Sequence, residues 1–592
     1  MKKTLILSVA ALCSAFTAWA NPIDRQTAQG IADQWMSHHS QRQVKTVLLS
    51  VENSYECEGA DVKSRMATHL TIANGSDQPA YYLFHAEQQP GFVIVAGDDT
   101  FPQIFGYSLT QILDEKIPIP DALTYLLDCY TEQVMAVRQG RMEAPASSES
   151  MLAASGLPAT VAPLLKSVWG QGNPYNLLCP KDGGSTVPCG CVATAMAQMM
   201  YYHKFPAQGR GNIAYNSTNI GGTITKDLST SFYHWELMGD TRAENLQPGA
   251  KETVAELCYD CGISVAMNYN RTGSGAYDDN TMRALVRNFS YKASTIQRLR
   301  RTYYSSAEEW INIIKKELAE SRPVFYSAVS STNTTGDGAG HAFVLDGYDS
   351  RNFVHVNWGW DGSYDGYFDI ALLNPSGYQF SEYQSAIIGI IPDETGEDNV
   401  FPQSRVMMAS GISTTSSVVN RTQSFKVNFP TYANSTLVTK NFTMGVGLFD
   451  KHGNFLAEIF GAGKTERLTG NSYGGSAGRA QVSIPASYPE GDYQVRVVFR
   501  EEGFEDWILP YVIGGAETNL IPCYVTDDAV YLNQVSTGIA QPSVSAATVV
   551  RTELYDMSGR RLSDQSAAMQ GLVLESTTLS DGTVQTRKRL LR

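Results

Sequence analysis

Cysteine and basic residues are both scarce in this sequence. Nine cysteines occur in 592 residues, which is too few for a scaffold held together by disulfides. Lysine and arginine number 45 against 59 aspartates and glutamates, giving a net charge of −14 and a pI near 5.2. Because nucleic acid is bound through basic surfaces, this balance argues against nucleic acid as a partner.

Long hydrophobic runs are missing as well. Lys2 and Lys3 precede an apolar run within residues 4–17, and Ala18-Trp19-Ala20 fits the small-x-small pattern at which signal peptides are cleaved. The run is shorter than the ~20 residues of a membrane span. We therefore expect residues 1–20 to be a signal peptide, and the protein to be secreted or at the cell surface with no stable membrane span.

The remaining length predicts about three or four domains. Residues 21–140 show helical patterns near 28–35 and 121–138, with strand-like segments between them. Residues 143–160 are rich in Ser, Ala and Pro without periodicity, which is typical of an exposed linker that proteases can reach. We expect 21–160 to form a separable N-terminal unit and its linker.

Three further regions follow the linker. Residues 161–395 predict an α+β domain, with helices near 191–203 and 307–318 followed by strands at 324–329, 341–347, 352–358 and 367–370. Residues 400–525 alternate apolar and polar positions in short runs, which predicts a β-sandwich. Residues 530–592 form a small tail with strand-like pieces and a basic end.

Cys191 is the candidate nucleophile. It follows the turn formers Pro188 and Gly190 and opens a clean helical run. A thiol at a helix start feels the positive end of the helix dipole, which lowers its pKa. Cys189 is a local rival that does not abut the helix. By position alone, a buried cysteine at a helix entry explains the pattern as well.

His341, Asn357, Trp358 and Gln171 supply the other groups that cysteine catalysis needs. His341 opens an apolar strand after a small, flexible approach, where an imidazole could serve as base. Asn357 and Trp358 end a second strand, where an amide could hold that imidazole and an indole could shield the contact. Gln171 could donate to an oxyanion together with the Cys191 backbone N–H. Singly, each has a structural explanation, as a satisfied histidine or a Gly-rich and Asn-rich turn. His355, in mid-strand, is expected to be structural.

Cys258 and Cys261 form a CxxC pair followed by Gly262 at an expected helix end. We interpret them as two buried thiols packed as small hydrophobic groups, in preference to a redox or metal pair. No second CxxC or CxxH accompanies them to complete a zinc site. Nothing in the sequence calls for a metal or an organic cofactor.

Four blocks in the order Gln, Cys, His, Asn-Trp resemble the streptopain family of papain-like cysteine peptidases, which includes interpain-type enzymes. They are residues 171–178, 190–195, 340–347 and 355–360. The resemblance covers roughly 161–395, and the segment 91–99 resembles this family's propeptide. It implies a papain-like fold of two subdomains and a Cys–His dyad. The implied activity is that of an endopeptidase favouring a bulky apolar residue two positions before the cut.

Carried over residue by residue, the resemblance makes Cys191 the nucleophile and His341 the general base and acid. Asn357 and Trp358 would orient and shield His341, and Gln171 would help to form the oxyanion hole. The partners implied are protein or peptide substrates and the chain's own propeptide, as an intramolecular inhibitor released by cleavage just before Val161. Extra Ser, Thr and Gly residues at 330–339 depart from the family pattern.

The tail resembles the C-terminal sorting domain of type IX secretion cargo, on residues 554–561 and the Asp581-Gly582 turn. Two other functions stay open. One is a Cys–His acyltransferase or amidase, although such enzymes usually use Asp as the third group. The other is a catalytically inactive surface-binding protein on a papain-like fold.

Overall fold

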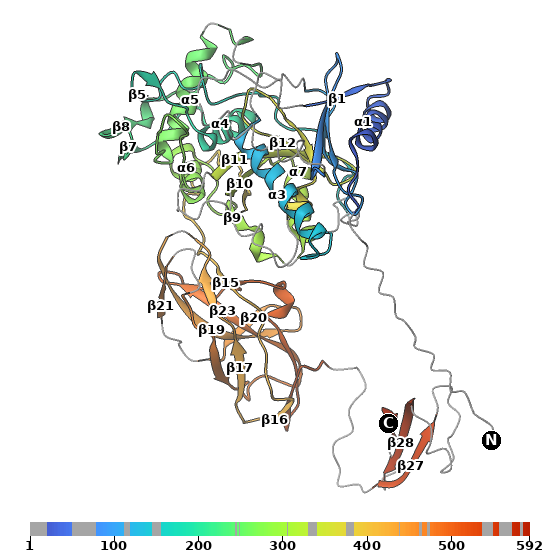
Figure 1. The fold of residues 1–592 in the computed structure, drawn as a ribbon. Coiled ribbons are helices and arrows are strands. Elements are labelled where there is room, and N and C mark those ends of the chain that lie inside the picture. The colour runs from blue at the N-terminus through green and yellow to red at the C-terminus, as the bar shows by residue number, and fades with distance from the viewer. Residues whose placement is uncertain are drawn as a thin grey trace, which may run out of the picture.

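A computed structural model describes residues 21–49, 78–111, 119–144, 156–242, 245–247, 249–304, 306–329, 340–373, 384–436, 438–460, 465–469, 474–535, 549–555, 571–579 and 584–591. The expected signal peptide, most of the linker, Cys57, the residues 330–339 and the sorting-motif residues 556–561, 581 and 582 lie outside these ranges. Figure 1 shows an upper body that contains the N-terminal unit and the catalytic region, a sandwich, and a small tail sheet.

One ten-stranded sheet runs through the N-terminal unit and the catalytic region, in the order β1-β2-β3-β4-β13-β12-β11-β10-β14-β9. The N-terminal unit supplies α1 (Arg25–Ser40), β1 (Thr46–Leu48), β2 (Tyr81–Ala86), β3 (Phe92–Ala96), β4 (Ile104–Ser108) and α3 (Asp121–Arg138). The strands of the 21–140 unit therefore belong to the same sheet as those of the catalytic region. Nothing in the sequence indicated this shared sheet.

The catalytic region has a helical half and a β half, as predicted. The helical half holds α4 (Cys191–His203), α5 (Ala250–Ser264), α6 (Asp278–Phe289) and the hairpins β5 (Lys181–Asp182) with β6 (Ser185–Thr186) and β7 (Asn212–Asn216) with β8 (Thr223–Asp227). The β half holds β9 (Gln297–Arg300), α7 (Ala307–Ala319), β10 (Val324–Val329), β11 (Gly340–Tyr348), β12 (Val354–Asn357), β13 (Gly366–Phe368) and β14 (Ser385–Ile388). The last two predicted strands are shorter than expected, and a 3-10 helix, η6 (Ile370–Leu373), follows β13.

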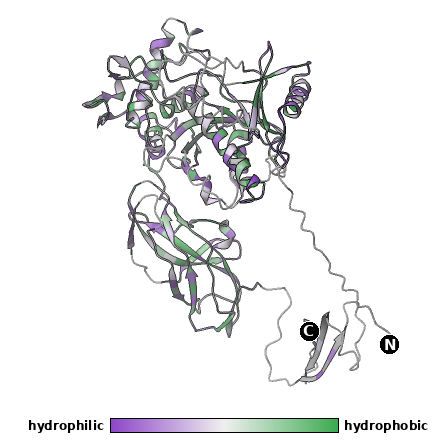
Figure 2. Ribbon diagram, in the orientation of Figure 1, coloured by the Kyte–Doolittle hydropathy of each residue, from purple (hydrophilic) through white to green (hydrophobic). Residues whose placement is uncertain are grey.

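Hydrophobic cores lie on both faces of this sheet, two of them in the catalytic region and a third under α1. One contains the buried faces of α4, α5 and α6 together with Phe325, Ala342 and Val344 of the sheet. The other contains α7, Phe343, Trp358 and the apolar face of α3. The helices that cover the sheet carry both hydrophobic and hydrophilic residues, as amphipathic helices do (Figure 2). Because α3 shares the second core, the N-terminal unit is packed into the catalytic region.

The junction between β4 and β13 joins the N-terminal unit to the catalytic region. Tyr107 of β4 pairs with Tyr367 of β13, and their rings stack with centroids 5.2 Å apart. The Tyr107 hydroxyl donates to Asp349 over 2.8 Å. From α3, the Tyr130 hydroxyl donates to the carbonyl of Asp369 at 3.1 Å. Backbone pairing, ring stacking and buried hydrogen bonds thus all cross this junction.

The predicted β-sandwich forms around a core of its own, but it extends past the expected end at 525, because Ala529–Leu532 pairs with Val418–Asn420 and with Ile521–Val525. Its strands are β15 (Val406–Met408), β16 (Val418–Asn420), β17 (Phe425–Phe429), β18 (Tyr432–Asn434), β19 (Lys440–Asp450), β20 (Phe455–Glu458), β21 (Thr465–Leu468), β22 (Gly478–Val482), β23 (Gly491–Glu501), β24 (Tyr511–Val512), β25 (Ile521–Val525) and β26 (Ala529–Leu532). Within this largely antiparallel arrangement, β15 and β24 pair in parallel.

The sandwich contacts the catalytic region through stacked tyrosines. Tyr303 and Tyr511 stack with ring centroids 4.5 Å apart, and the Tyr303 hydroxyl donates to the carbonyl of Ser435 at 3.1 Å. In the tail, β27 (Val549–Tyr555), β28 (Gly571–Leu579) and β29 (Val584–Leu591) form a three-stranded antiparallel sheet. No helix among the described residues is both long enough and apolar enough to cross a membrane.

Candidate active site

Cys191 is the first residue of α4, as the sequence predicted. Gly190 before it has φ +94°, a conformation that favours glycine, and a Cβ there would lie 2.8 Å from the carbonyl oxygen of Ser274. The Ser274 hydroxyl donates to the carbonyl of Pro188 at 2.7 Å. The turn before the nucleophile is therefore held against the 267–276 loop, where a side chain larger than hydrogen would not fit.

The Cys191 thiol lies against the start of β11. The backbone N–H of Ala342 donates to Cys191 Sγ at 3.4 Å, which brings the residue after His341 into contact with the nucleophile. His341 is partly exposed and pairs with Ala328 of β10. Two residues 150 positions apart in the sequence thus meet at one end of α4.

Burial governs the state of the thiol in this form of the chain. Cys191 is 9% exposed, and desolvation raises its pKa above the ordinary value, while N–H groups of Ala342, Val192 and Cys191 oppose the rise. The helix start alone led us to expect a lowered pKa. In this structure the cost of burying a thiolate exceeds that stabilisation.

Gln171 lies beside the nucleophile turn. Its carbonyl accepts from the backbone N–H of Cys189 at 3.1 Å, and the carbonyl of Gly170 accepts from the Thr194 hydroxyl at 3.3 Å. Thr194 is one turn after Cys191 on α4. The segment that carries Gln171 is therefore fixed against both the turn and the first turn of the helix.

Asn357 ends β12 with its side chain directed at α4. Its Oδ1 accepts from Gln198 Nε2 and from the Gly359 N–H, both at 3.0 Å, and its Nδ2 donates to the carbonyl of Ser167 at 2.9 Å. Asn357 is 4% exposed. These bonds tie the Asn357 side chain to the nucleophile helix and to the turn at 358–360, while its backbone is paired with Val344 of β11.

Trp358 lies on the opposite face of the sheet, in the core shared with α3. Its ring is 4.8 Å from that of Phe343, two residues after His341, and its Nε1–H donates to the carbonyl of Tyr364 at 3.0 Å. Its backbone N–H donates to Asp365 Oδ1 at 2.9 Å. Burial raises the pKa of Asp365 to about 7. The indole thus packs directly under the strand that carries His341.

His355 has the structural role that the sequence suggested. Its Nδ1 lies 2.6 Å from Asp346 Oδ1. Burial lowers the pKa of His355, but Asp346 outweighs this effect and leaves that pKa above its ordinary value. Asp346 Oδ2 also accepts from the Leu165 N–H at 3.0 Å, so the pair holds the first segment of the catalytic region against β11.

Comparison with known proteins identifies the family of this chain. Residues 169–368 match the model of the Peptidase C10 family, and residues 20–134 match that of the Spi protease inhibitor. Streptopain of Streptococcus pyogenes is 36% identical over 335 residues, covering 51% of this chain and 78% of streptopain. The chain belongs to the peptidase C10 family. It is a cysteine endopeptidase made as a zymogen, with the N-terminal unit as inhibitory propeptide.

Two other similarities were found. The thiol protease/hemagglutinin PrtT of Porphyromonas gingivalis is 29% identical over 536 residues, which cover 87% of this chain and 57% of PrtT. The chain therefore spans little more than half of that relative. A structure of a Prevotella intermedia prointerpain A fragment is 30% identical, with 53% of this chain and 96% of the fragment covered and a TM-score of 0.47.

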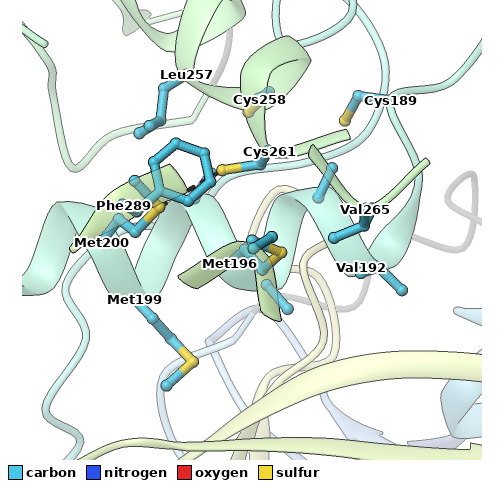
Figure 3. Close-up of a cluster of buried hydrophobic side chains, with 14 of the residues drawn as sticks. Cys189, Val192, Met196, Met199, Met200, Leu257, Cys258, Cys261, Val265 and Phe289 are labelled. Carbon is cyan, nitrogen blue, oxygen red and sulfur yellow. Dashed lines mark hydrogen bonds between the residues drawn. The ribbon is translucent and has the colours of Figure 1, made fainter. Parts of the chain in front are cut away.

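The other cysteines of this C10 chain that the structure describes are buried. Cys189, Cys258 and Cys261 are fully buried, and Cys261 Sγ lies 3.6 Å from Met200 Sδ (Figure 3). This confirms the prediction of packed thiols for the CxxC pair. Among the described residues, no group of three or more His, Cys, Asp or Glu side chains is arranged to hold a metal ion.

Sequence reasoning missed Gln198. It is fully buried on α4 and bonds to both the Asn357 side chain and the segment before Gln171. The signal that could have found it is a polar residue seven positions after Cys191 in an otherwise apolar helix, because such a residue needs a buried partner.

Proposed function

We propose that Cys191 and His341 are the catalytic dyad of this endopeptidase. The supporting observation is the contact of Ala342 N–H with Cys191 Sγ at 3.4 Å, which sets the strand position of the histidine beside the nucleophile. His341 takes the thiol proton, and the thiolate then attacks the carbonyl carbon of a peptide bond. His341 returns that proton to the leaving amine, and a water molecule hydrolyses the resulting thioester.

We assign the oxyanion to the Gln171 side chain and the Cys191 backbone N–H. The bond from the Cys189 N–H to the Gln171 backbone carbonyl supports this role, since it holds the backbone of Gln171 beside the turn that precedes Cys191. Asn357 and Trp358 orient and shield His341, the first through the 358–360 turn and the second through Phe343 below the strand.

We propose that activation follows cleavage just before Val161, within or beside the exposed linker. Val161 and Tyr348 exchange two backbone hydrogen bonds of 2.9 Å, so the new N-terminus would stay attached to β11. Substrates are proteins or peptides, with a bulky apolar residue two positions before the cut.

We also propose export by the signal peptide, and type IX secretion directed by the 530–592 tail. The three-stranded sheet of the tail supports an independently folded address domain. Secretion of the chain with and without residues 549–592, a truncation that leaves β26 in the sandwich, tests the assignment in a host that has this pathway. Equal export of both forms contradicts it.

The dyad is tested by labelling with an epoxide probe together with casein cleavage. Cys191→Ser should lose both, whereas Cys523→Ser, which alters a buried thiol in the sandwich, should keep both. Full casein cleavage by Cys191→Ser would refute the assignment. Mass spectrometry of products formed with an added amine distinguishes hydrolysis from acyl transfer.

N-terminal sequencing of the active protein tests the activation step. We expect Val161 as the first residue, and no processing in Cys191→Ala if the enzyme cuts itself. An active form that still begins at Asn21 would refute the inhibitory role of the propeptide.

A further inference from the structure

The nucleophile helix carries a buried amide that touches each of the other segments of the site. Cys191, Thr194 and Gln198 follow one another at helical spacings of three and four, so they lie along one face of α4. Gln198 is about 10 Å along the helix from Cys191, at 1.5 Å per residue over seven residues. It is therefore too far away to touch the scissile bond, although it shares the face of the nucleophile.

Both functional groups of Gln198 are used. Its Oε1 accepts from the Ser167 hydroxyl at 3.0 Å and from the Trp169 backbone N–H at 3.2 Å. Its Nε2 donates to Asn357 Oδ1 at 3.0 Å. Ser167 and Trp169 belong to the segment that leads to Gln171, while Asn357 opens the turn below β11. One side chain thus joins the nucleophile helix, the oxyanion segment and the Asn-Trp turn.

The surroundings leave these segments little freedom to shift. Gln198, Trp169 and Thr194 are fully buried. A Cβ on Gly359, which has φ +71°, would lie 3.0 Å from Thr194 Cγ2, so the turn is pressed against α4. The Asp361 N–H also donates to the Trp169 carbonyl at 3.1 Å. In such a site a lost hydrogen bond cannot be replaced by water without displacing a segment.

We propose that Gln198 is a positioning residue that sets the relative placement of Cys191, Gln171 and the 357–360 turn during catalysis. The proposal rests on the assignment of the dyad. Small displacements of reacting groups lower the rate of the chemical step more than the binding of substrate. We therefore expect loss of Gln198 to act on kcat and to leave KM nearly unchanged.

The decisive variant is Gln198→Glu, because the pH controls whether the introduced carboxyl group carries a proton. A carboxyl group keeps the acceptor for Ser167 and Trp169, but the ionised form cannot donate to Asn357 Oδ1. Burial raises the pKa of a carboxyl group, so acidification restores an O–H donor at this position. The ratio of its kcat to that of the wild type at the same pH should rise at least tenfold between pH 8 and pH 5.5, with KM within about twofold.

Gln384→Glu is the matched control. Gln384 is another fully buried amide of the catalytic region, and it accepts from the Tyr326 hydroxyl, away from the segments of the site. Its kcat ratio to the wild type should not change with pH. All precursors are activated by the same tagged wild-type enzyme, which is then removed, and folding is checked by circular dichroism.

A pH-independent kcat ratio for folded Gln198→Glu, or a loss confined to KM, would overturn the proposal. If Gln198 variants do not fold, Ser167→Ala removes the hydroxyl that donates to Gln198 Oε1. An unchanged kcat in this variant would equally overturn the proposal. The dyad itself is tested first, on the activated wild-type enzyme. If this enzyme neither cleaves casein nor reacts with the epoxide probe, the dyad assignment is refuted before any variant is compared.

Discussion

Replacement of Gly106 by alanine should release the propeptide. Gly106 lies on β4 opposite Phe368 of β13. A Cβ at this position would lie 2.6 Å from Cδ1 of the Phe368 ring and 3.1 Å from the carbonyl oxygen of Tyr367. All of these atoms belong to the catalytic region. The strain therefore exists only while the propeptide is docked and disappears when it leaves.

The magnitude follows from how firmly Phe368 is held. Its ring is fully buried, with the rings of Trp358 at 5.3 Å and Phe92 at 6.2 Å, so it cannot swing aside. Adding a methyl group to a packed site of this kind costs about 1–3 kcal/mol. Since 1.4 kcal/mol is a factor of ten, the fraction of chains with an undocked propeptide should increase by roughly 5-fold to 150-fold.

The assay is alkylation of Cys191 in the intact precursor, because burial now raises the pKa of this thiol and shields it. Chloroacetamide labelling is followed by mass spectrometry while the chain is still full length. Gly106→Ala should label faster by the factor given above, and casein cleavage should begin earlier.

Gly30→Ala is the matched control, because this substitution adds the same methyl group to α1 of the propeptide, where a Cβ meets nothing within 4 Å. It should label like the wild type. A Gly106→Ala precursor that folds normally and labels at the wild-type rate would refute the reasoning, as would equal acceleration in Gly30→Ala.

Three further predictions concern the oxyanion, acid stability and the sandwich. Gln171→Ala should lower kcat about a hundredfold or more, the effect of one lost oxyanion donor, and an unchanged kcat would remove Gln171 from the site. Burial lowers the pKa of His203 to about 4, so between about pH 6.5 and 4 this imidazole is protonated in the unfolded chain and neutral in the folded chain. Stability is therefore lost as the pH falls through this window, by ~2 kcal/mol at pH 5, and urea titrations should show a smaller loss in His203→Gln. Tyr511→Ala should remove ~1 kcal/mol of ring stacking with Tyr303, loosening the sandwich in limited proteolysis without changing kcat.

The sequence predicted best those features that depend on neighbouring residues. The bounds of α3 and α4 agree with the structure, and α7 extends one residue further than expected. At α4, a Pro and Gly turn is followed directly by an apolar run, so the helix start could be placed at Cys191. The dyad could be proposed because four motif blocks occur in one order.

Contacts between distant segments were harder to predict. The pairing of β4 with β13 joins two strand edges about 260 positions apart, and neither strand carries a mark of its partner. The one sign in the sequence is the short run Ile104-Phe105-Gly106-Tyr107, which lacks polar alternation; the structure buries the whole of Ile104–Ser108, as strands covered on both faces are. Such burial shows that β4 is internal, without showing which edge it meets.

Asn357 illustrates how strand periodicity limits a motif. The resemblance placed Asn357 and Trp358 together at the imidazole, but successive residues of a strand point to opposite faces. Trp358 enters the core shared with α3, whereas Asn357 faces α4 and binds Gln198. The pair therefore supports β11 from both sides of the sheet, which adjacency in the sequence does not reveal.

Cleavage of the linker should not by itself release the propeptide. The side chains of α3 that enter the shared core are Leu123, Leu126, Leu127, Tyr130 and Val134, and all are at most 3% exposed. Burying five such side chains contributes on the order of 10 kcal/mol, before the costs of association are subtracted. A nicked propeptide should therefore stay bound over Phe343 and Trp358, the residues that support the strand of His341. We therefore expect activation to require, besides the cut, that the propeptide be degraded or its docked form weakened. A methyl group at the β4–β13 junction weakens the docked form, and for this reason it should increase the labelling rate of Cys191, which lies in another part of the fold.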